Sequence, residues 1–169
     1  PTENPGAGGN QPPLVQCADW EELHPKPSFC GGPPGPVSVN GCGPGGWLSF
    51  IGALYPDGPF GNACNVHDAC YSMLGADRSA CDAGLNANMG QVCNNYFGCI
   101  MDLETHQFQC NGTPAQLQAC HDDRAGVMSD LNSWWAGPTI AARFNTVQQE
   151  AACRLWFNAR ANESNCPPP

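Results

Sequence analysis

The sequence predicts an all-α, disulfide-rich protein, and three observations support this prediction. Its 169 residues include 12 cysteines, a share close to that of a disulfide scaffold. After residue 61, apolar residues recur three and four positions apart, as they do along one face of a helix. No segment of useful length alternates apolar and polar residues in the manner of a half-buried strand. A chain of this length usually forms one domain.

Two helices are expected in the middle of the chain. The first covers residues 62–75 and ends at Gly75, because glycine commonly follows the last turn of a helix. The second begins after Ser79 as its N-cap, with Asp82 three positions later in a variant capping box. Its apolar stripe consists of Leu85, Met89, Val92, Tyr96 and Ile100.

Two further helices are expected towards the carboxyl end. One opens at Pro114 and is broken by Gly137-Pro138. Its shared face consists of Leu117, Cys120, Arg124, Val127, Leu131 and Trp134, with Arg124 as the only misfit. The other carries a stripe of Ile140, Phe144, Val147, Ala151 and Leu155.

The first 46 residues hold much of the chain's proline and glycine, and no helical period survives there. We expect residues 1–16 to be a flexible arm and residues 17–46 to be a loop tied down by its cysteines. A single disulfide-stapled domain is predicted over 17–166, followed by a proline-rich tail at 167–169.

Charge and composition exclude several classes of protein. Six Lys and Arg against 15 Asp and Glu give a net charge of −9, so a basic nucleic-acid-binding surface is not expected. No apolar run reaches the roughly 18 residues that a membrane span needs. Charge is also too sparse for a charge-driven disordered protein.

The cysteines indicate an oxidising compartment. No C-x-x-C pair occurs, so six disulfides are favoured over zinc sites. The sequence starts at Pro1 without a leader, as the mature form of a secreted protein would. Two sequons, at Asn111 and Asn162, fit a secreted glycoprotein.

The most informative stretch reads C-N-V-H-D-A-C-Y over residues 64–71. On a helix, His67 shares a face with Cys64, Cys70 and Tyr71, whereas Asp68 lies on an adjoining face. Cysteines on both sides of His67 would hold this face in place, as a catalytic group requires. A lone His-Asp pair would otherwise suggest an ordinary helix surface.

A glycine-rich segment, G-C-G-P-G-G at residues 41–46, precedes this helix. Such a loop can turn several carbonyl or N–H groups towards one point. Carbonyl oxygens with a carboxylate suit calcium, which takes about 6–8 oxygen ligands. The N–H groups of the same loop suit a developing oxyanion.

Together, C-G-P-G-G at 42–46 and H-D-A-C-Y at 67–71 resemble the calcium loop and active-site helix of the secreted phospholipase A2 superfamily. The segment C-D-A-G-L at 81–85 and N-G-C-G at 40–43 are similar to the group XII branch. The resemblance covers roughly residues 38–90 and implies two antiparallel helices that carry the active site beside a calcium loop. Additional carboxy-terminal helices would complete the fold.

The resemblance also implies a role for each motif residue. His67 would be the general base, Asp82 the carboxylate that orients it, and Tyr71 a hydrogen-bond donor to Asp82. Ca2+ would be held by Asp68 and by the backbone carbonyls of Gly41, Gly43 and Gly45, and the N–H of Gly43 would be an oxyanion donor. By the same analogy, Cys42 pairs with Cys64, and Cys70 pairs with Cys81.

Several features depart from the family or leave alternatives open. The amphipathic amino-terminal helix of venom and pancreatic enzymes is absent, and residues 91–169 match no family segment. Asp123, in C-H-D-D-R-A, competes with Asp82 as the orienting acid. The apolar residues Trp47, Leu48, Phe50 and Ile51 suit either a core or a lipid-contacting collar. Trp134 and Trp135 are expected to pack, and His24, His106 and His121 to be solvated.

The resulting expectation is a secreted, monomeric, calcium-dependent enzyme that acts at a phospholipid membrane or micelle surface. It would hydrolyse the sn-2 ester of glycerophospholipids to a fatty acid and a lysophospholipid. One alternative is a non-catalytic lipid- or receptor-binding module on the same scaffold. Another is a secreted interaction protein that works through its proline-rich arm and its last 79 residues.

Overall fold

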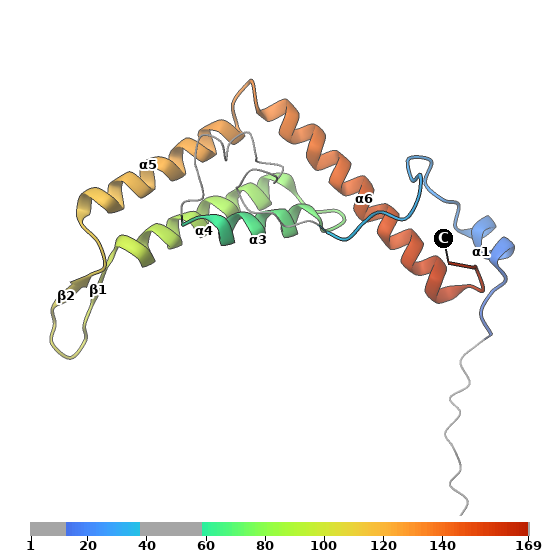
Figure 1. Ribbon diagram of the computed structural model, residues 1–169, viewed down its shortest axis with the longest axis horizontal. Helices are drawn as coiled ribbons and strands as arrows, with labels where there is room; N and C mark the ends of the chain where they lie inside the picture. The colour runs from blue at the N-terminus through green and yellow to red at the C-terminus, as the bar shows by residue number, and fades with distance from the viewer. Residues whose placement is uncertain (1–12, 38–58, 169) are drawn as a thin grey trace, which may run out of the picture. The chain divides into compact units, whose positions relative to one another are not determined.

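A computed structural model describes residues 13–37 and 59–168, and these residues are mostly helical (Figure 1). The helices are α1 (Cys17–Leu23), α3 (Gly61–Tyr71), α4 (Arg78–Phe97), α5 (Pro114–Leu131) and α6 (Gly137–Glu163). A two-stranded antiparallel sheet, β1 (Cys99–Met101) and β2 (Phe108–Cys110), lies between α4 and α5. The prediction of a mostly helical protein is confirmed, although it missed this small sheet. No helix among the described residues is long and apolar enough to cross a membrane.

The predicted disulfide scaffold is also confirmed. Every described cysteine is disulfide-bonded. Five bonds join cysteines that are both described: Cys17–Cys166, Cys30–Cys153, Cys70–Cys81, Cys93–Cys120 and Cys99–Cys110. The predicted partner of Cys64, Cys42, lies outside the described residues, as does the glycine-rich loop.

Contacts divide the described chain into two compact units. The terminal unit contains the described residues up to Pro34 together with those from Cys153 onward. The central unit contains the described residues between Gly35 and Ala152. The boundary falls within α6, so this helix contributes its first part to one unit and its last part to the other.

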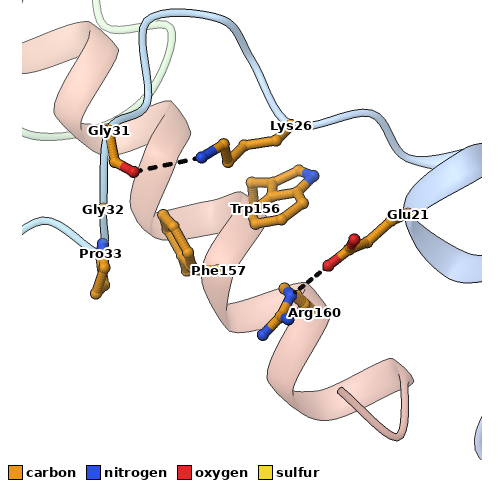
Figure 2. Close-up of a pocket in the computed structure, with 8 residues that line it drawn as sticks. All are labelled: Glu21, Lys26, Gly31, Gly32, Pro33, Trp156, Phe157 and Arg160. Atoms are coloured by element: carbon orange, nitrogen blue, oxygen red, sulfur yellow. Dashed lines mark hydrogen bonds and ion pairs between the residues drawn. The ribbon is translucent and has the colours of Figure 1, made fainter. Parts of the chain in front are cut away.

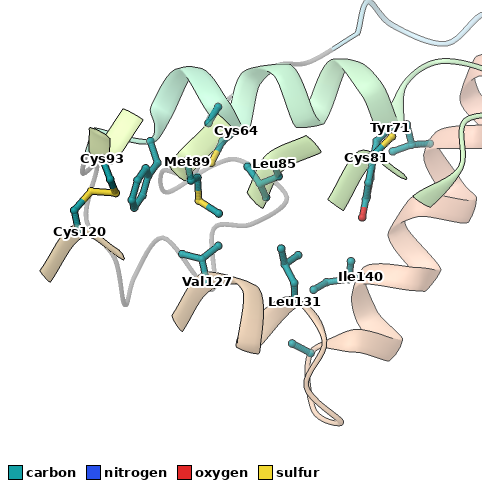
Figure 3. Close-up of a cluster of buried hydrophobic side chains, with 14 residues drawn as sticks. Cys64, Tyr71, Cys81, Leu85, Met89, Cys93, Cys120, Val127, Leu131 and Ile140 are labelled. Atoms are coloured by element: carbon teal, nitrogen blue, oxygen red, sulfur yellow. A yellow bond between two sulfur atoms is a disulfide. The ribbon is translucent and has the colours of Figure 1, made fainter. Parts of the chain in front are cut away.

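The central unit is built around α4, which packs against both α3 and α5. Figure 3 shows that α3 and α4 are antiparallel: α3 runs in one direction from Cys64 to Tyr71, and α4 runs in the opposite direction from Cys81 to Cys93. Burial of these apolar faces, rather than intrinsic helix propensity, supplies most of the stability of such helices. The largest fully buried apolar side chains of this core are Tyr71, Leu85, Met89, Leu131 and Ile140.

The turn between α3 and α4 differs from the predicted one at both ends. Helix α3 ends at Tyr71, four residues before the expected Gly75. Gly75 instead lies in the turn with a φ of +77°, a left-handed conformation that glycine adopts readily. The N-cap of α4 is Asp77 and not Ser79, because the Asp77 carboxylate accepts from the Ala80 N–H at 2.9 Å. Ser79 lies inside the helix and donates to Asp77 at 2.6 Å.

Helix α4 stops earlier than its apolar pattern predicts. The helix ends at Phe97, and Ile100, expected on its inner face, lies in β1 with 67% of its surface exposed. Tyr96 is exposed as well. The Cys99–Cys110 disulfide pairs the first residue of β1 with the last of β2, so the hairpin replaces the next helical turn.

The start of α5 agrees with the prediction, and its end does not. Thr113 is the N-cap and forms a reciprocal capping box with Gln116, and Pro114 occupies the first turn. Trp134 and Trp135, both expected to pack, lie beyond the helix and are 89% and 45% exposed. Gly137 and Pro138 open α6 rather than break a helix, because proline is tolerated in a first turn, where its N–H is not needed.

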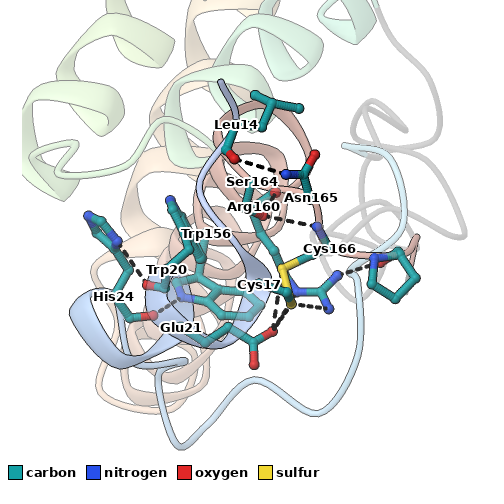
Figure 4. The surroundings of a disulfide bond; sticks show 11 residues. Leu14, Cys17, Trp20, Glu21, His24, Trp156, Arg160, Ser164, Asn165 and Cys166 are labelled. Atoms are coloured by element: carbon teal, nitrogen blue, oxygen red, sulfur yellow. Dashed lines mark hydrogen bonds and ion pairs between the residues drawn. A yellow bond between two sulfur atoms is a disulfide. The ribbon is translucent and has the colours of Figure 1, made fainter. Parts of the chain in front are cut away.

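The terminal unit contains a helix where a loop was expected. Helix α1 buries Trp20, whose indole N–H donates to Glu163 of α6 at 3.3 Å. The Cys17–Cys166 disulfide joins the start of α1 to the segment after α6 (Figure 4). A short parallel bridge between Val15 and Ser164 lies beside it. Leu155, expected on the buried face of α6, is exposed in this unit.

Candidate functional site

His67 and Asp82 form a buried pair in the central unit. His67 projects from α3 with 1% of its surface exposed, and its Nε2 lies 2.8 Å from Oδ1 of Asp82 on α4. An ionised carboxylate can only accept hydrogen bonds, so Nε2 donates its proton to Asp82. This tautomer leaves the lone pair of a neutral imidazole on Nδ1.

Tyr71 is the second donor to the same oxygen. Its hydroxyl donates to Oδ1 of Asp82 at 2.6 Å, and its ring centre lies 4.1 Å from that of His67. Phe144 of α6 also contacts the tyrosine ring, in an edge-to-face arrangement with ring centres 4.8 Å apart. Burial, together with the hydrogen bond and the negative charge of Asp82, raises the pKa of the Tyr71 phenol well above its ordinary value. Tyr71 therefore stays protonated and acts as a donor throughout the neutral range.

Asp82 remains ionised although it is largely buried. Burial by itself raises the pKa of this carboxyl, but the hydrogen bonds from His67 and Tyr71, together with nearby positive charge, outweigh it and lower the pKa below its usual range. Arg78, one helical turn earlier on α4, adds a positive charge, with Nε at 3.5 Å from Oδ2 of Asp82. Arg78 was not among the predicted site residues, although its i, i+4 spacing from Asp82 is a recognisable signal.

The Cys70–Cys81 disulfide, which the family resemblance implied, is confirmed. It joins the residue before Tyr71 to the residue before Asp82, with the two Cα atoms 5.8 Å apart. Tyr71 and Asp82, which share a hydrogen bond, are therefore each adjacent in sequence to a cysteine of this disulfide. A disulfide in this position limits how far α3 and α4 can shift relative to one another.

Gln148 of α6 fixes the same end of α3 through its side-chain amide. Its nitrogen donates to the backbone carbonyls of Tyr71 at 2.8 Å and Met73 at 2.9 Å. Its oxygen accepts from the N–H of Gly75 at 2.7 Å. Sequence reasoning missed Gln148, because a single neutral amide on a helix carries no recognisable pattern.

Of the predicted calcium ligands, the structure describes only Asp68. Asp68 has 3% of its surface exposed and follows His67 directly on α3. Gly41, Gly43 and Gly45 lie outside the described residues, as do Trp47, Leu48, Phe50 and Ile51. Among the described residues, one group of three potential metal-binding side chains comes together: Cys17, Glu21 and Cys166. The two thiols of this group are consumed by a disulfide, so it is not a metal centre.

The competing acid, Asp123, does not accompany His67. It is exposed on α5, whereas Asp82 contacts the imidazole directly. His24 and His106 are exposed, as predicted, and His121 is partly exposed with Nε2 at 3.3 Å from Oδ1 of Asn94. The structure thus brings together three predicted residues: His67, Tyr71 and Asp82.

No protein-family model, curated protein or solved structure matches this chain. The similarity to secreted phospholipases A2 therefore rests on the motifs quoted above, and membership of that family stays a prediction. Chemically, the site offers a buried imidazole on an ionised carboxylate, a pair suited to removing a proton from a bound nucleophile.

Proposed function

We propose that this protein catalyses the calcium-dependent hydrolysis of the sn-2 ester of glycerophospholipids. The observation that supports this most is the hydrogen-bonded group of His67, Asp82 and Tyr71 between two disulfide-linked helices. A buried carboxylate that accepts from both the imidazole and the phenol is suited to stabilising an imidazolium. The products would be a fatty acid and a lysophospholipid.

In the proposed reaction, water is the nucleophile and His67 is the general base. Nδ1 accepts a proton from the water as the water oxygen bonds to the ester carbonyl carbon. The imidazolium that forms is stabilised by Asp82, which keeps its charge because Tyr71 also donates to it. As the carbon–oxygen bond to the glycerol breaks, the proton passes from His67 to the departing alkoxide. The carboxyl product takes the oxygen of the water.

The calcium requirement rests on Asp68 and on the expectation for the glycine-rich loop. A buried carboxylate next to the general base fits the hard oxygen ligands that calcium prefers. The backbone carbonyls of Gly41, Gly43 and Gly45 would be the other protein ligands, and the Gly43 N–H would meet the oxyanion. Bound calcium would supply positive charge for the ester carbonyl and the phosphate.

The proposal is tested by measuring fatty-acid release from sn-2-labelled phosphatidylcholine vesicles, with millimolar calcium and with chelator. We expect release by the wild type in calcium alone, and its loss in His67→Gln. His121→Gln is the matched control, since this histidine is partly exposed on α5 and should be dispensable.

Two outcomes would contradict the proposal. Undiminished release by His67→Gln would remove the histidine from the role of base. No release under either condition, from protein whose disulfides are intact, would favour the non-catalytic binding module instead. Measuring calcium binding of Asp68→Asn beside the wild type would then show whether the cation site exists without turnover.

A further inference from the structure

The terminal unit contains an open cavity of about 540 Å³ that the proposed function does not use. Residues of α1, the segment that follows it and the last part of α6 line this cavity (Figure 2). Two disulfides, Cys17–Cys166 and Cys30–Cys153, join these segments covalently. The volume of the cavity lies within the range of about 300–1,000 Å³ that is typical of small-molecule sites.

One side of the cavity is apolar and rigidly placed. Trp156 and Phe157, adjacent on α6, meet edge-to-face with ring centres 4.9 Å apart. The Trp156 indole N–H donates to the carbonyl of His24 at 2.8 Å, which fixes the orientation of the ring. Pro33 adds a further apolar surface. These groups suit a ligand with an apolar chain or ring.

Among the charged side chains that line the cavity, one positive charge remains after the ion pair is counted. Arg160 donates to the Glu21 carboxylate at 2.8 Å and to the Pro167 carbonyl at 2.7 Å, so its charge is balanced. Lys26 donates to the carbonyl of Gly31 at 3.3 Å, and its ammonium group has two further N–H donors. Lys26 is the only lysine of a chain with net charge −9, so this cavity contrasts in sign with the protein as a whole.

We propose that this cavity binds an amphiphilic carboxylate, with its alkyl chain on Trp156 and Phe157 and its carboxylate on Lys26. An anion is favoured over a cation because the only acid of the lining, Glu21, is already paired. The proposal goes beyond the hydrolytic function and does not depend on it. Fatty acids released by any ester hydrolysis would be ligands of this class.

The test uses decanoate as the ligand, below its micellar concentration and with chelator present. Reductive methylation with ¹³C-formaldehyde labels the single lysine side chain, so Lys26 gives its own methyl signal in NMR spectra. We expect decanoate to shift this signal saturably, and decyltrimethylammonium, with the same chain and the opposite charge, to leave it unchanged. Isothermal titration calorimetry then provides affinities for the variants.

We expect Lys26→Gln to weaken decanoate binding about fivefold, and Lys26→Arg to retain it, because an exposed ion pair contributes on this scale. Phe157→Ala should weaken binding about tenfold through lost apolar contact. Arg143→Gln, which makes the same change of net charge at a residue that is not part of the cavity lining, should bind as the wild type does.

Three results would overturn the inference: no saturable shift of the Lys26 signal, equal binding of the cationic amphiphile, or an equal loss in Arg143→Gln. Because decanoate contains no ester and calcium is chelated, none of these results depends on whether the protein hydrolyses phospholipids. Likewise, an absence of hydrolysis would leave the binding measurement intact.

Discussion

The imidazole of His67 and the carboxylate of Asp82 meet at 2.8 Å although 15 residues separate them along the chain. Each comes from a different helix, so the contact depends on how α3 and α4 are held together and not on the geometry of either helix alone. The Cys70–Cys81 disulfide and the Gln148 amide both act on this helix pair.

The first prediction concerns Asp82, the acid that accepts a hydrogen bond from His67. Asp82→Asn keeps the size of the side chain and removes the charge that stabilises the imidazolium, so hydrolysis should fall on the order of 10²-fold or more. Asp123→Asn is the control, because Asp123 is an exposed acid of α5. The measurement is the rate of fatty-acid release in calcium. Equal rates for both variants would show that Asp82 does not assist the base.

The second prediction compares two disulfides that each span 11 residues, Cys70–Cys81 and Cys99–Cys110. Replacing either pair by serine should cost about 3 kcal/mol of unfolding free energy, since loops of equal length restrict the unfolded chain equally. The rate of hydrolysis should distinguish the two variants. Loss of Cys70–Cys81 lets Tyr71 and Asp82 shift and should lower hydrolysis at least tenfold, whereas loss of the hairpin disulfide should not.

Urea unfolding and fatty-acid release, measured on the same two double-serine variants, check this prediction. If the hairpin variant loses as much activity as the Cys70–Cys81 variant, then general destabilisation, and not placement of the site, explains the effect.

The third prediction is a pH dependence of stability. The folded-state pKa of Asp82 is lowered, so its contribution is complete above the ordinary Asp value of about 3.9 and is lost as pH falls through the folded-state pKa. The difference in unfolding free energy between the wild type and Asp82→Asn should therefore shrink as pH falls below about 4. Asp77 and Asp102, whose pKa values are also lowered, are present in both proteins and cancel in this difference.

Urea unfolding midpoints measured at intervals between neutral pH and strongly acidic pH would show this convergence. A difference that stays constant throughout the acidic range would mean that Asp82 carries no stabilising charge in the folded protein.

The fourth prediction concerns Gln148. Its side chain makes three hydrogen bonds to the backbone of the α3–α4 turn, so Gln148→Ala should lower the unfolding free energy by about 2–3 kcal/mol. Gln149→Ala is the neighbouring control on the exposed face of α6. Chemical denaturation of both variants tests this. A Gln148→Ala midpoint equal to that of Gln149→Ala would mean that water replaces the amide without loss.

The helices that sequence reasoning located best are those whose apolar residues recur over several turns. The apolar stripe of α4 correctly placed Leu85 and Met89 in the core. It also wrongly included Ile100, because apolar periodicity gives no information about the Cys99–Cys110 disulfide, which closes a hairpin at this point. Helix α1 was missed because its seven residues lie in a proline- and glycine-rich region. Contacts distant in sequence, from Trp20 to Glu163 and from Cys17 to Cys166, stabilise it.

The site was predictable where a residue has a chemical signature. His67, Tyr71 and Asp82 come from recognisable motifs, and the structure brings them together. Gln148 was not found, because a glutamine on a helix is most often solvated. Arg78 was overlooked although its i, i+4 spacing from Asp82 is a recognisable signal. Only the packed arrangement of α3, α4 and α6 shows that Gln148 reaches the turn.

The pairing of the chain's ends has a consequence for its biosynthesis. Cys17 precedes its partner Cys166 by 149 residues, and Cys30 precedes Cys153 by 123. At a ribosomal rate of about 5–20 residues per second, Cys17 is synthesised about 7–30 seconds before Cys166. During that interval, thiols of the central unit emerge and compete for it. Correct oxidation of this protein therefore requires that the Cys17 thiol be kept reduced, or that a wrong bond be exchanged, until Cys166 has been synthesised.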